Sequence, residues 1–171
     1  MAARNDIPAA LARSWLLVAA TRPEEFEAAS GSRADQLVLD IEDAVDPAAK
    51  PKARADVLEW LRGGGRAWVR INDRSTDFWC GDVDELAGAP GLLGVMLAKT
   101  ESALHVTETF DRLRGAYPVI HSWSLRSASR SRSPSLALGG QRAWRSAVAT
   151  TGAIPVRLRT TWPCCIRAPG W

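Results

Sequence analysis

The chain has 171 residues, of which 46% are apolar and 24% are charged, and its formal net charge is +3. This length allows one domain with a sizeable core and is too short for two ordinary domains. No apolar run reaches the ~20 residues that a membrane-spanning helix requires, and no basic stretch followed by an apolar core indicates a secretory signal. We therefore expect a cytoplasmic protein without a membrane partner.

The net charge is the sum of two segments with opposite charge. All 19 acidic residues lie at or before Asp111 together with 12 Lys and Arg, whereas residues 112–171 hold 10 Arg and no Lys, Asp or Glu. Cys80 and the adjacent pair Cys164 and Cys165 fit neither a disulfide framework nor the spacing of a zinc site. We interpret Cys80 as a free thiol with a structural role.

Short apolar runs rich in Val, Leu and Ile recur from residue 13 to about residue 120. They lie at residues 15–18, 36–39, 67–71 and 92–97, and a fifth begins at Tyr117. Their starts are roughly 20 to 30 residues apart, which is the length of a strand, a helix and two loops. Nearly continuous apolar strands are typical of a parallel sheet that is buried on both faces. The spacing therefore predicts successive βαβ units.

Three helices are predicted between these strands. Pro23, followed by two glutamates, suits a first helical turn, where a missing N–H costs little and carboxylates face the positive end of the dipole. Residues 48–62 carry apolar side chains at helical spacing and end at three consecutive glycines. Residues 102–114 show a similar pattern, which Gly115 ends.

Charged and polar side chains directly follow three successive predicted strands. They are Asp40, Glu42 and Asp43 after the second strand, Arg70 and Asn72 at the end of the third, and Lys99 after the fourth. In parallel α/β folds the ligand site forms outside the carboxyl ends of the strands. Any one such residue is more often a solvated loop residue or a helix cap, and Asp43 as a cap or Lys99 extended beside Glu101 fits that interpretation. The coincidence on three strands favours a site.

Six strings in register resemble the citrate lyase beta-subunit-like branch of the HpcH/HpaI aldolase family over roughly residues 13–120. They are RSWLLV from Arg13, TRPE from Thr21, ADQLVLDIEDAV from Ala34, Lys50 with Ala53 and Arg54, WVRIN from Trp68, and GVMLAKTE from Gly94. Two departures change loop residues without removing a charge. Ala19 and Ala20 stand where the family commonly has Pro-Gly, and Ala98 stands where it has Pro before Lys99.

The resemblance implies a (β/α)8 TIM barrel, an α/β fold, that uses Mg²⁺ to cleave or form a carbon–carbon bond in 3-hydroxyacyl-CoA esters such as citryl-, citramalyl- or malyl-CoA. The partners it implies are an acyl-CoA ester and a 2-keto acid, and a homo-oligomer is compatible with it. Arg70 matches the arginine that clamps the substrate carboxylate, and Arg13 and Arg22 match positions of CoA or carboxylate contacts. Glu42 and Asp43 match acids near the metal that hold its waters. The predicted catalytic residues are thus Arg70 and Asp43.

Residues 121–171 do not continue the family pattern. The family continues with a strand that ends in a metal-binding Glu, in a Val-Glu-Ser setting, and later with a Phe-Gly-Ser-Gly-Asp segment that carries the second metal ligand. Neither occurs here, and the segment instead alternates Ser with Arg and contains four of the eight Trp. We therefore divide the chain into an N-terminal extension (1–12), an incomplete barrel of the first four to five βα units (13–120) and a non-homologous basic tail that we expect to be disordered (121–171).

The composition of this tail is typical of GC-rich coding sequence that is read in a wrong frame. When permitted codons for residues 121–128 are regrouped from the third base of each, they encode Leu-Val-Glu-Ser-Ala-Leu-Gly. The same regrouping of residues 143–167 gives a run that begins Leu-Ala-Phe-Gly-Ser-Gly-Asp. Because both missing motifs return in order and in one frame, we interpret the tail as the product of a frameshift near codons 119–121.

This interpretation predicts that the chain as written lacks lyase activity. Acids that only hold the waters of the metal should bind Mg²⁺ weakly, and an unclosed parallel sheet leaves unpaired edges. The alternative is a non-enzymatic basic protein, in which the Arg/Ser tail with spaced Trp binds RNA through phosphate contacts and stacking or is disordered. A steep loss of RNA affinity with salt would support that alternative, and no binding at low salt would reject it.

Overall fold

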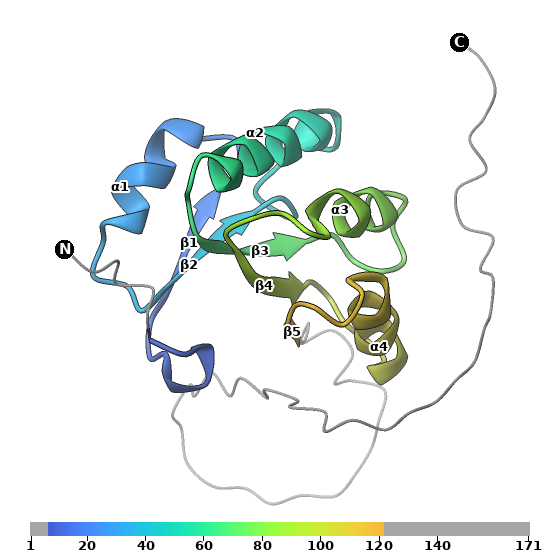
Figure 1. Cartoon of the computed structure of the whole chain (residues 1–171). Helices are drawn as coiled ribbons and strands as arrows, with labels where there is room; N and C mark the ends of the chain where they lie inside the picture. The colour runs from blue at the N-terminus through green and yellow to red at the C-terminus, as the bar shows by residue number, and fades with distance from the viewer. Residues whose placement is uncertain (1–6, 122–171) are drawn as a thin grey trace, which may run out of the picture.

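Five parallel strands form the centre of the structure, a computed structural model that describes residues 7–121 (Figure 1). They are β1 (Trp15–Ala19), β2 (Gln36–Asp40), β3 (Ala67–Ile71), β4 (Leu92–Leu97) and β5 (Val119–His121). Each strand pairs in parallel with the next, in the order β1-β2-β3-β4-β5. Within the described residues the sheet does not close, since β1 and β5 each pair with one strand. The expected α/β fold with an incomplete barrel is confirmed.

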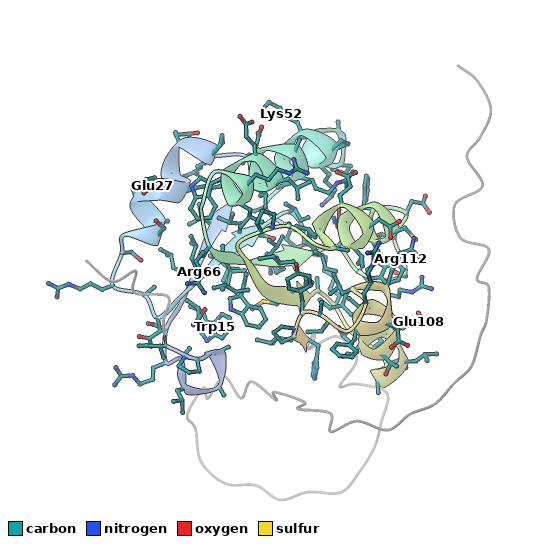
Figure 2. All side chains as sticks on the ribbon, viewed as in Figure 1. Trp15, Glu27, Lys52, Arg66, Glu108 and Arg112 are labelled. Carbon is teal, nitrogen blue, oxygen red and sulfur yellow. The ribbon has the colours of Figure 1, made fainter. Side chains whose placement is uncertain are left out.

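The connections between the strands are helical and cover one face of the sheet (Figure 1). The α-helices of residues 7–121 are α1 (Phe26–Ser30), α2 (Lys50–Arg62), α3 (Phe78–Leu86) and α4 (Ala103–Arg112). Short 3-10 turns lie at η2 (Ala9–Leu11), η3 (Pro23–Glu25) and η4 (Pro47–Ala49). Glu27 on α1 and Lys52 on α2 are exposed and point away from the sheet (Figure 2). The layers are therefore those of half a barrel, with helices outside the strands.

Alternate positions along the strands supply two separate apolar clusters. Leu37 and Leu39 of β2 are fully buried against the helices, where they meet Val57 of α2. Val38 belongs instead to the cluster on the opposite face, together with Trp68. The rings of Trp15 and Trp68 meet there edge to face, with centroids 5.4 Å apart. Burial of both faces explains why the strands read as continuous apolar runs.

The structure contains one helix that the sequence analysis does not predict. Helix α3 connects β3 to β4 and places Trp79, Val83 and Leu86 in the core at helical spacing. Asp82 lies within the same helix and is fully buried. A carboxylate in the middle of the buried face interrupts the apolar pattern of a helix that is only nine residues long, which explains the omission.

The other predicted helices are confirmed with shifted ends. The helix expected over residues 48–62 divides into η4 and α2, and the Asp46 side chain accepts a hydrogen bond from Ala48 N–H at the start. Ser102 caps α4, and Gly115 follows it with φ +65°. Cys80, the one cysteine among residues 7–121, lies buried. No helix of residues 7–121 is long and apolar enough to cross a membrane. The predictions on the tail lie outside the described residues.

Candidate active site

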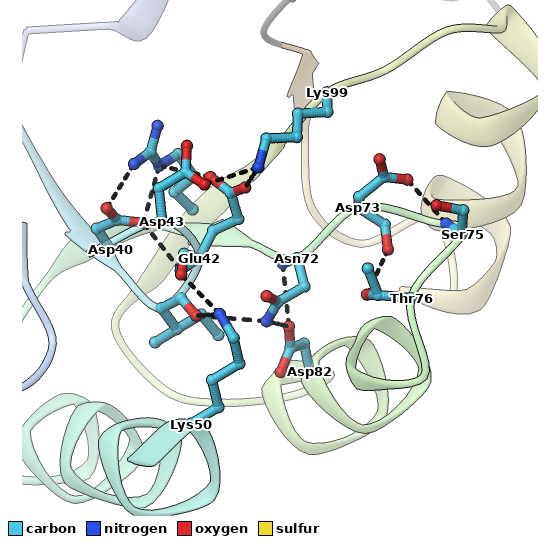
Figure 3. A network of polar contacts seen from close by, with 12 residues as sticks. Asp40, Glu42, Asp43, Lys50, Asn72, Asp73, Ser75, Thr76, Asp82 and Lys99 are labelled. Atoms are coloured by element: carbon cyan, nitrogen blue, oxygen red, sulfur yellow. Dashed lines mark hydrogen bonds and ion pairs between the residues drawn. The ribbon is translucent and has the colours of Figure 1, made fainter. Parts of the chain in front are cut away.

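The carboxyl ends of β2, β3 and β4 bring charged side chains together at one edge of the sheet (Figure 3). Asp40 ends β2 and stands opposite Arg70 in the register between β2 and β3. Glu42 and Asp43 follow β2, and Lys99 follows β4. These five are in contact through ion pairs. The prediction that the three strand ends share one charged site is therefore confirmed in its geometry.

Asp40 and Arg70 form a two-pronged ion pair. Arg70 Nε donates to Asp40 Oδ1 at 2.8 Å, and Arg70 Nη2 donates to Asp40 Oδ2 at 2.5 Å. The side chain of Asp40 is 3% exposed and that of Arg70 is 19% exposed. Hydrogen bonding to Asp40 raises the pKa of the Arg70 guanidinium above its ordinary value. Arg70 therefore carries a permanent positive charge at the end of β3.

Lys99 bridges the two acids that follow β2. Its Nζ lies 2.6 Å from Glu42 Oε1 and 2.7 Å from Asp43 Oδ1. The hydrogen bond from Lys99 lowers the pKa of Asp43. Burial raises the pKa of Glu42, although Lys99 opposes that shift. Lys99 therefore pairs with both acids rather than extending beside Glu101. Asp43 takes part in this ion pair, whereas Asp46 is the cap of the next turn.

A second set of polar contacts supports the backbone beneath these acids (Figure 3). The buried Lys50 Nζ donates to the carbonyl oxygens of Ile41 at 3.0 Å and of Glu42 at 2.6 Å. Asn72 Nδ2 donates to Ile41 O at 3.3 Å and to Asp82 Oδ2 at 2.6 Å. Asp82 also accepts from Asn72 N–H. The loop after β2 is therefore fixed by α2, β3 and α3 together.

Asp82 is itself paired with a cation. Arg54 of α2 donates through Nη1 to Asp82 Oδ1 at 2.9 Å and through Nη2 to Glu85 at 2.8 Å. The sequence predicts no role for Lys50 and Arg54 beyond their place in the family strings. Their spacing of four residues, which puts both on one face of a helix, was the available signal. Asp82 gave no comparable signal, because its role depends on a helix that was not predicted.

The two remaining predicted binding residues lie apart from this cluster. Arg13 precedes β1, at the opposite end of the sheet, and its side chain is 88% exposed while its N–H donates to Asp35. Arg22 follows β1 and pairs with Glu25 at 3.0 Å on the surface. The structure thus brings Arg70, Glu42 and Asp43 together and leaves Arg13 and Arg22 outside. Binding of substrate by Arg13 and Arg22 stays a prediction.

The acids of the cluster do not fit a directly bound Mg²⁺. Mg²⁺ needs oxygen ligands in near-octahedral geometry. Both carboxylate oxygens of Asp40 already accept hydrogen bonds from Arg70. One oxygen each of Glu42 and Asp43 is paired with Lys99. Glu42 Oε2 is buried without a hydrogen bond, which leaves one oxygen there. Among residues 7–121 no group of three or more His, Cys, Asp or Glu side chains could hold a metal ion.

Fold and site together define an α/β protein of the barrel type with a charged site at the carboxyl ends of its strands. The sequence profile described as HpcH/HpaI aldolase/citrate lyase matches residues 13–118. The chain belongs to this family, and the resemblance stated from its six strings is confirmed.

Two curated relatives show what the matched part is similar to. A citrate lyase subunit beta-like protein of Mycobacterium tuberculosis is 41% identical over 98 residues, which are 57% of this chain and 35% of the relative. An L-malyl-CoA/beta-methylmalyl-CoA lyase of Cereibacter sphaeroides is 39% identical over 105 residues, with 58% and 33% covered. The chain thus spans about a third of the length of these curated relatives.

Solved structures give the same result for the fold. The citrate lyase beta subunit of M. tuberculosis complexed with oxaloacetate and magnesium is 35% identical with a TM-score of 0.54, over 67% of this chain and 48% of that one. The protein CitE of the same organism in complex with magnesium, acetoacetate and coenzyme A is 34% identical with a TM-score of 0.57, over 69% and 42%. RipC from Yersinia pestis is 29% identical with a TM-score of 0.52, over 69% and 49%.

Proposed function

We propose that residues 13–121 form the carboxylate-binding part of a Mg²⁺-dependent carbon–carbon lyase for 3-hydroxyacyl-CoA esters, such as malyl-, citramalyl- or citryl-CoA. The observation that carries this proposal is the Arg70 guanidinium, which is fixed at the carboxyl end of β3 with donors left over. A guanidinium in such a place recognises a carboxylate by paired hydrogen bonds. Relatives named malyl-CoA lyase, and similar structures with magnesium and oxaloacetate, support the choice of substrate class.

Each charged group has a part in this function. Arg70 binds the carboxylate of the 2-keto acid portion. Glu42 and Asp43 would hold the waters of a bound metal, and Lys99 forms ion pairs with both acids. When bound, the metal would supply a Lewis acid for the keto oxygen, and its direct ligands would have to come from outside residues 7–121.

We further propose that the 171-residue chain does not complete the reaction, because a frameshift near codons 119–121 replaced the motifs with the two metal ligands. The match to the family ends at residue 118, just before this position. A closed barrel of this kind takes about 250 residues, so the four to five βα units preserved here supply only part of the site. The frameshift also explains why residues 121–171 hold no Lys, Asp or Glu.

One pair of proteins tests both statements. The first is the 171-residue chain, and the second is the product of the same gene after the frame is corrected near codon 120. With Mg²⁺ and malyl-, citramalyl- or citryl-CoA, we expect no cleavage by the first and cleavage of at least one ester by the second. Cleavage by the first would refute the inactivity. A folded but inactive second protein would refute the lyase function.

The corrected protein also tests the role of Arg70. Arg70→Lys keeps the charge but removes the guanidinium fork, the planar set of donors that makes paired hydrogen bonds to a carboxylate. The loss of one charge-assisted hydrogen bond, about 2 kcal/mol, should lower kcat/KM by roughly 30-fold. Arg112→Lys is the matched control, because Arg112 makes a similar fork with Asp84 on the helical surface. Equal effects of the two substitutions would show that Arg70 has no special role in binding.

A further inference from the structure

The fork between Arg70 and Asp40 uses one edge of the guanidinium and leaves another unused. A guanidinium has five N–H donors in one plane. Nε and Nη2 of Arg70 each donate one hydrogen bond to Asp40. Within residues 7–121, Nη1 donates none, and the closest contact to Glu42, from Nε to Oε2, is an ion pair of 3.7 Å. The edge formed by Nη1 and Nη2 is therefore available to an external carboxylate.

Asp40 is held in place independently of Arg70. Its Oδ1 also accepts a hydrogen bond from Glu42 N–H at 2.9 Å, and its backbone carbonyl accepts one from Ala20 N–H. The backbone beside it is paired as well, because Ile41 N–H donates to Arg70 O. With a side chain that is 3% exposed, the Asp40 carboxylate is a fixed reference point to which the longer Arg70 side chain is fastened.

We propose that Asp40 is a positioning residue that turns the free edge of Arg70 toward the substrate carboxylate; this inference rests on the proposed function. Without Asp40, two acids compete for the guanidinium. Arg70 already forms an ion pair with Glu42, and Asp43 lies in the same cluster. A guanidinium that turned to these acids would present a different edge, and the planar, two-bond recognition of a carboxylate would be lost.

A second fork in the same protein provides a matched control. Arg112 Nε and Nη2 donate to Asp84 Oδ1 and Oδ2, both at 2.7 Å, with the same pairing of atoms as in the Arg70 fork. This pair joins α3 to α4, and the Asp84 side chain is 53% exposed. Asp84→Asn therefore removes the same type of interaction from a place outside the cluster of Asp40, Glu42, Asp43, Arg70 and Lys99.

The test uses the 171-residue chain with pyruvate as the probe, because pyruvate is the smallest 2-keto acid. Side-chain ¹⁵N spectra resolve the Nε–H of Arg70, which is assigned by its loss in Arg70→Lys. In the unmodified chain, pyruvate should shift the Nη signals while Nε–H stays in place and exchanges slowly. Asp40→Asn should make Nε–H exchange fast and weaken pyruvate binding at least 10-fold. Asp84→Asn should change pyruvate binding by less than 2-fold.

Two results would overturn the inference. One is pyruvate binding by a folded Asp40→Asn protein that equals binding by the unmodified chain. The other needs no variant, and so holds even where Asp40→Asn does not fold: an Nε–H signal that shifts with pyruvate as strongly as Nη would mean that the fork opens to take the ligand. Failure of the proposed function looks different. In that case pyruvate leaves every Arg70 signal unchanged, while Nε–H still exchanges slowly. Asp40 would then hold Arg70 in place, but Arg70 would bind no keto acid.

Discussion

Residues 41–43, the loop that follows β2, are contacted from two sides by different kinds of bonds. On the buried side, Lys50 and Asn72 donate to backbone carbonyl oxygens. On the solvent side, Lys99 pairs with the carboxylates of Glu42 and Asp43, and it is 49% exposed. Bonds to carbonyl oxygens set the path of the loop, whereas bonds to carboxylates set the charge that the loop presents.

The difference indicates where stability and function reside. A buried polar group that loses its partner costs about 1–3 kcal/mol, more when it is charged, while an exposed ion pair contributes at most about 1 kcal/mol. Substitutions on the buried side should therefore lower the free energy of unfolding most. Substitutions on the solvent side should mainly change how stability depends on pH. Four predictions test this division, from the largest expected effect to the smallest.

Removing the anchor of the buried side should have the largest effect. Asp82 is 1% exposed in its side chain and accepts hydrogen bonds from Arg54 Nη1, from Asn72 N–H and from Asn72 Nδ2. Asp82→Ala leaves these donors without an acceptor, so the free energy of unfolding should fall by about 3 kcal/mol or more. Urea denaturation measures this change. Asp84→Ala, on the exposed side of the same helix, should cost less than about 1 kcal/mol, and similar costs for the two would contradict the division.

Lys50 should contribute less than Asp82, because one of its acceptors has another donor. Ile41 O also accepts a hydrogen bond from Asn72 Nδ2. Lys50→Met therefore removes the side-chain donor mainly from Glu42 O. We expect a cost of about 2 kcal/mol from urea denaturation. Lys52→Met is the control on the same helix, where the exposed pair with Asp56 should be worth about 0.5 kcal/mol. A Lys50→Met protein as stable as its parent would mean that the carbonyl contacts do not fix the loop.

The strands could be predicted from the sequence more completely than the buried side of the site. Continuous apolar runs placed β3 and β4 at their observed bounds, and the rule on strand ends gathered Asp40, Arg70 and Lys99 at one edge. Which cation meets which acid depends on the register between strands, and the apolar pattern does not give that register. The role of Asp82 was missed together with α3, since its partners converge on it from α2 and β3.

On the solvent side, Lys99→Met should change the pH dependence of stability. Asp43 has a lowered pKa, chiefly through Lys99, so it stabilises the fold above its ordinary value of 3.8 and loses that contribution as pH falls through the lowered pKa. Burial raises the pKa of Glu42 and loss of Lys99 would raise it further, so its cost to stability grows as pH rises from the ordinary value of 4.5 through the raised pKa. Both effects lower the free energy of unfolding of Lys99→Met at neutral pH, by about 1 kcal/mol.

Urea denaturation at pH 7 and at pH 3.5 measures this difference, and carboxyl ¹³C titration follows the pKa of Asp43 directly. The gap between Lys99→Met and the unmodified chain should narrow at the lower pH, because pH 3.5 lies below the ordinary pKa values of both acids, 3.8 and 4.5, and protons bound by the unfolded state then reduce the contribution of the ion pairs. Lys52→Met, which removes only the pair with Asp56, should show a smaller narrowing. A gap that is constant with pH would mean that Lys99 acts through packing and not through its charge.

The backbone of Lys99 gives the smallest effect and separates its charge from its conformation. Lys99 adopts φ +45°, in the left-handed region, which costs a side-chain-bearing residue about 1 kcal/mol and glycine nearly nothing. Both Lys99→Met and Lys99→Gly remove the ion pairs, but Lys99→Gly also relieves this strain at some cost in chain entropy. Lys99→Gly should therefore be the more stable of the two by about 0.5 kcal/mol in urea denaturation. If Lys99→Met is instead the more stable, then the side chain stem contributes packing that outweighs the strain. If the order is as expected, then the ion pairs of Lys99 with Glu42 and Asp43 hold a strained residue in place, and the solvent side of the loop maintains its charge against a conformational cost.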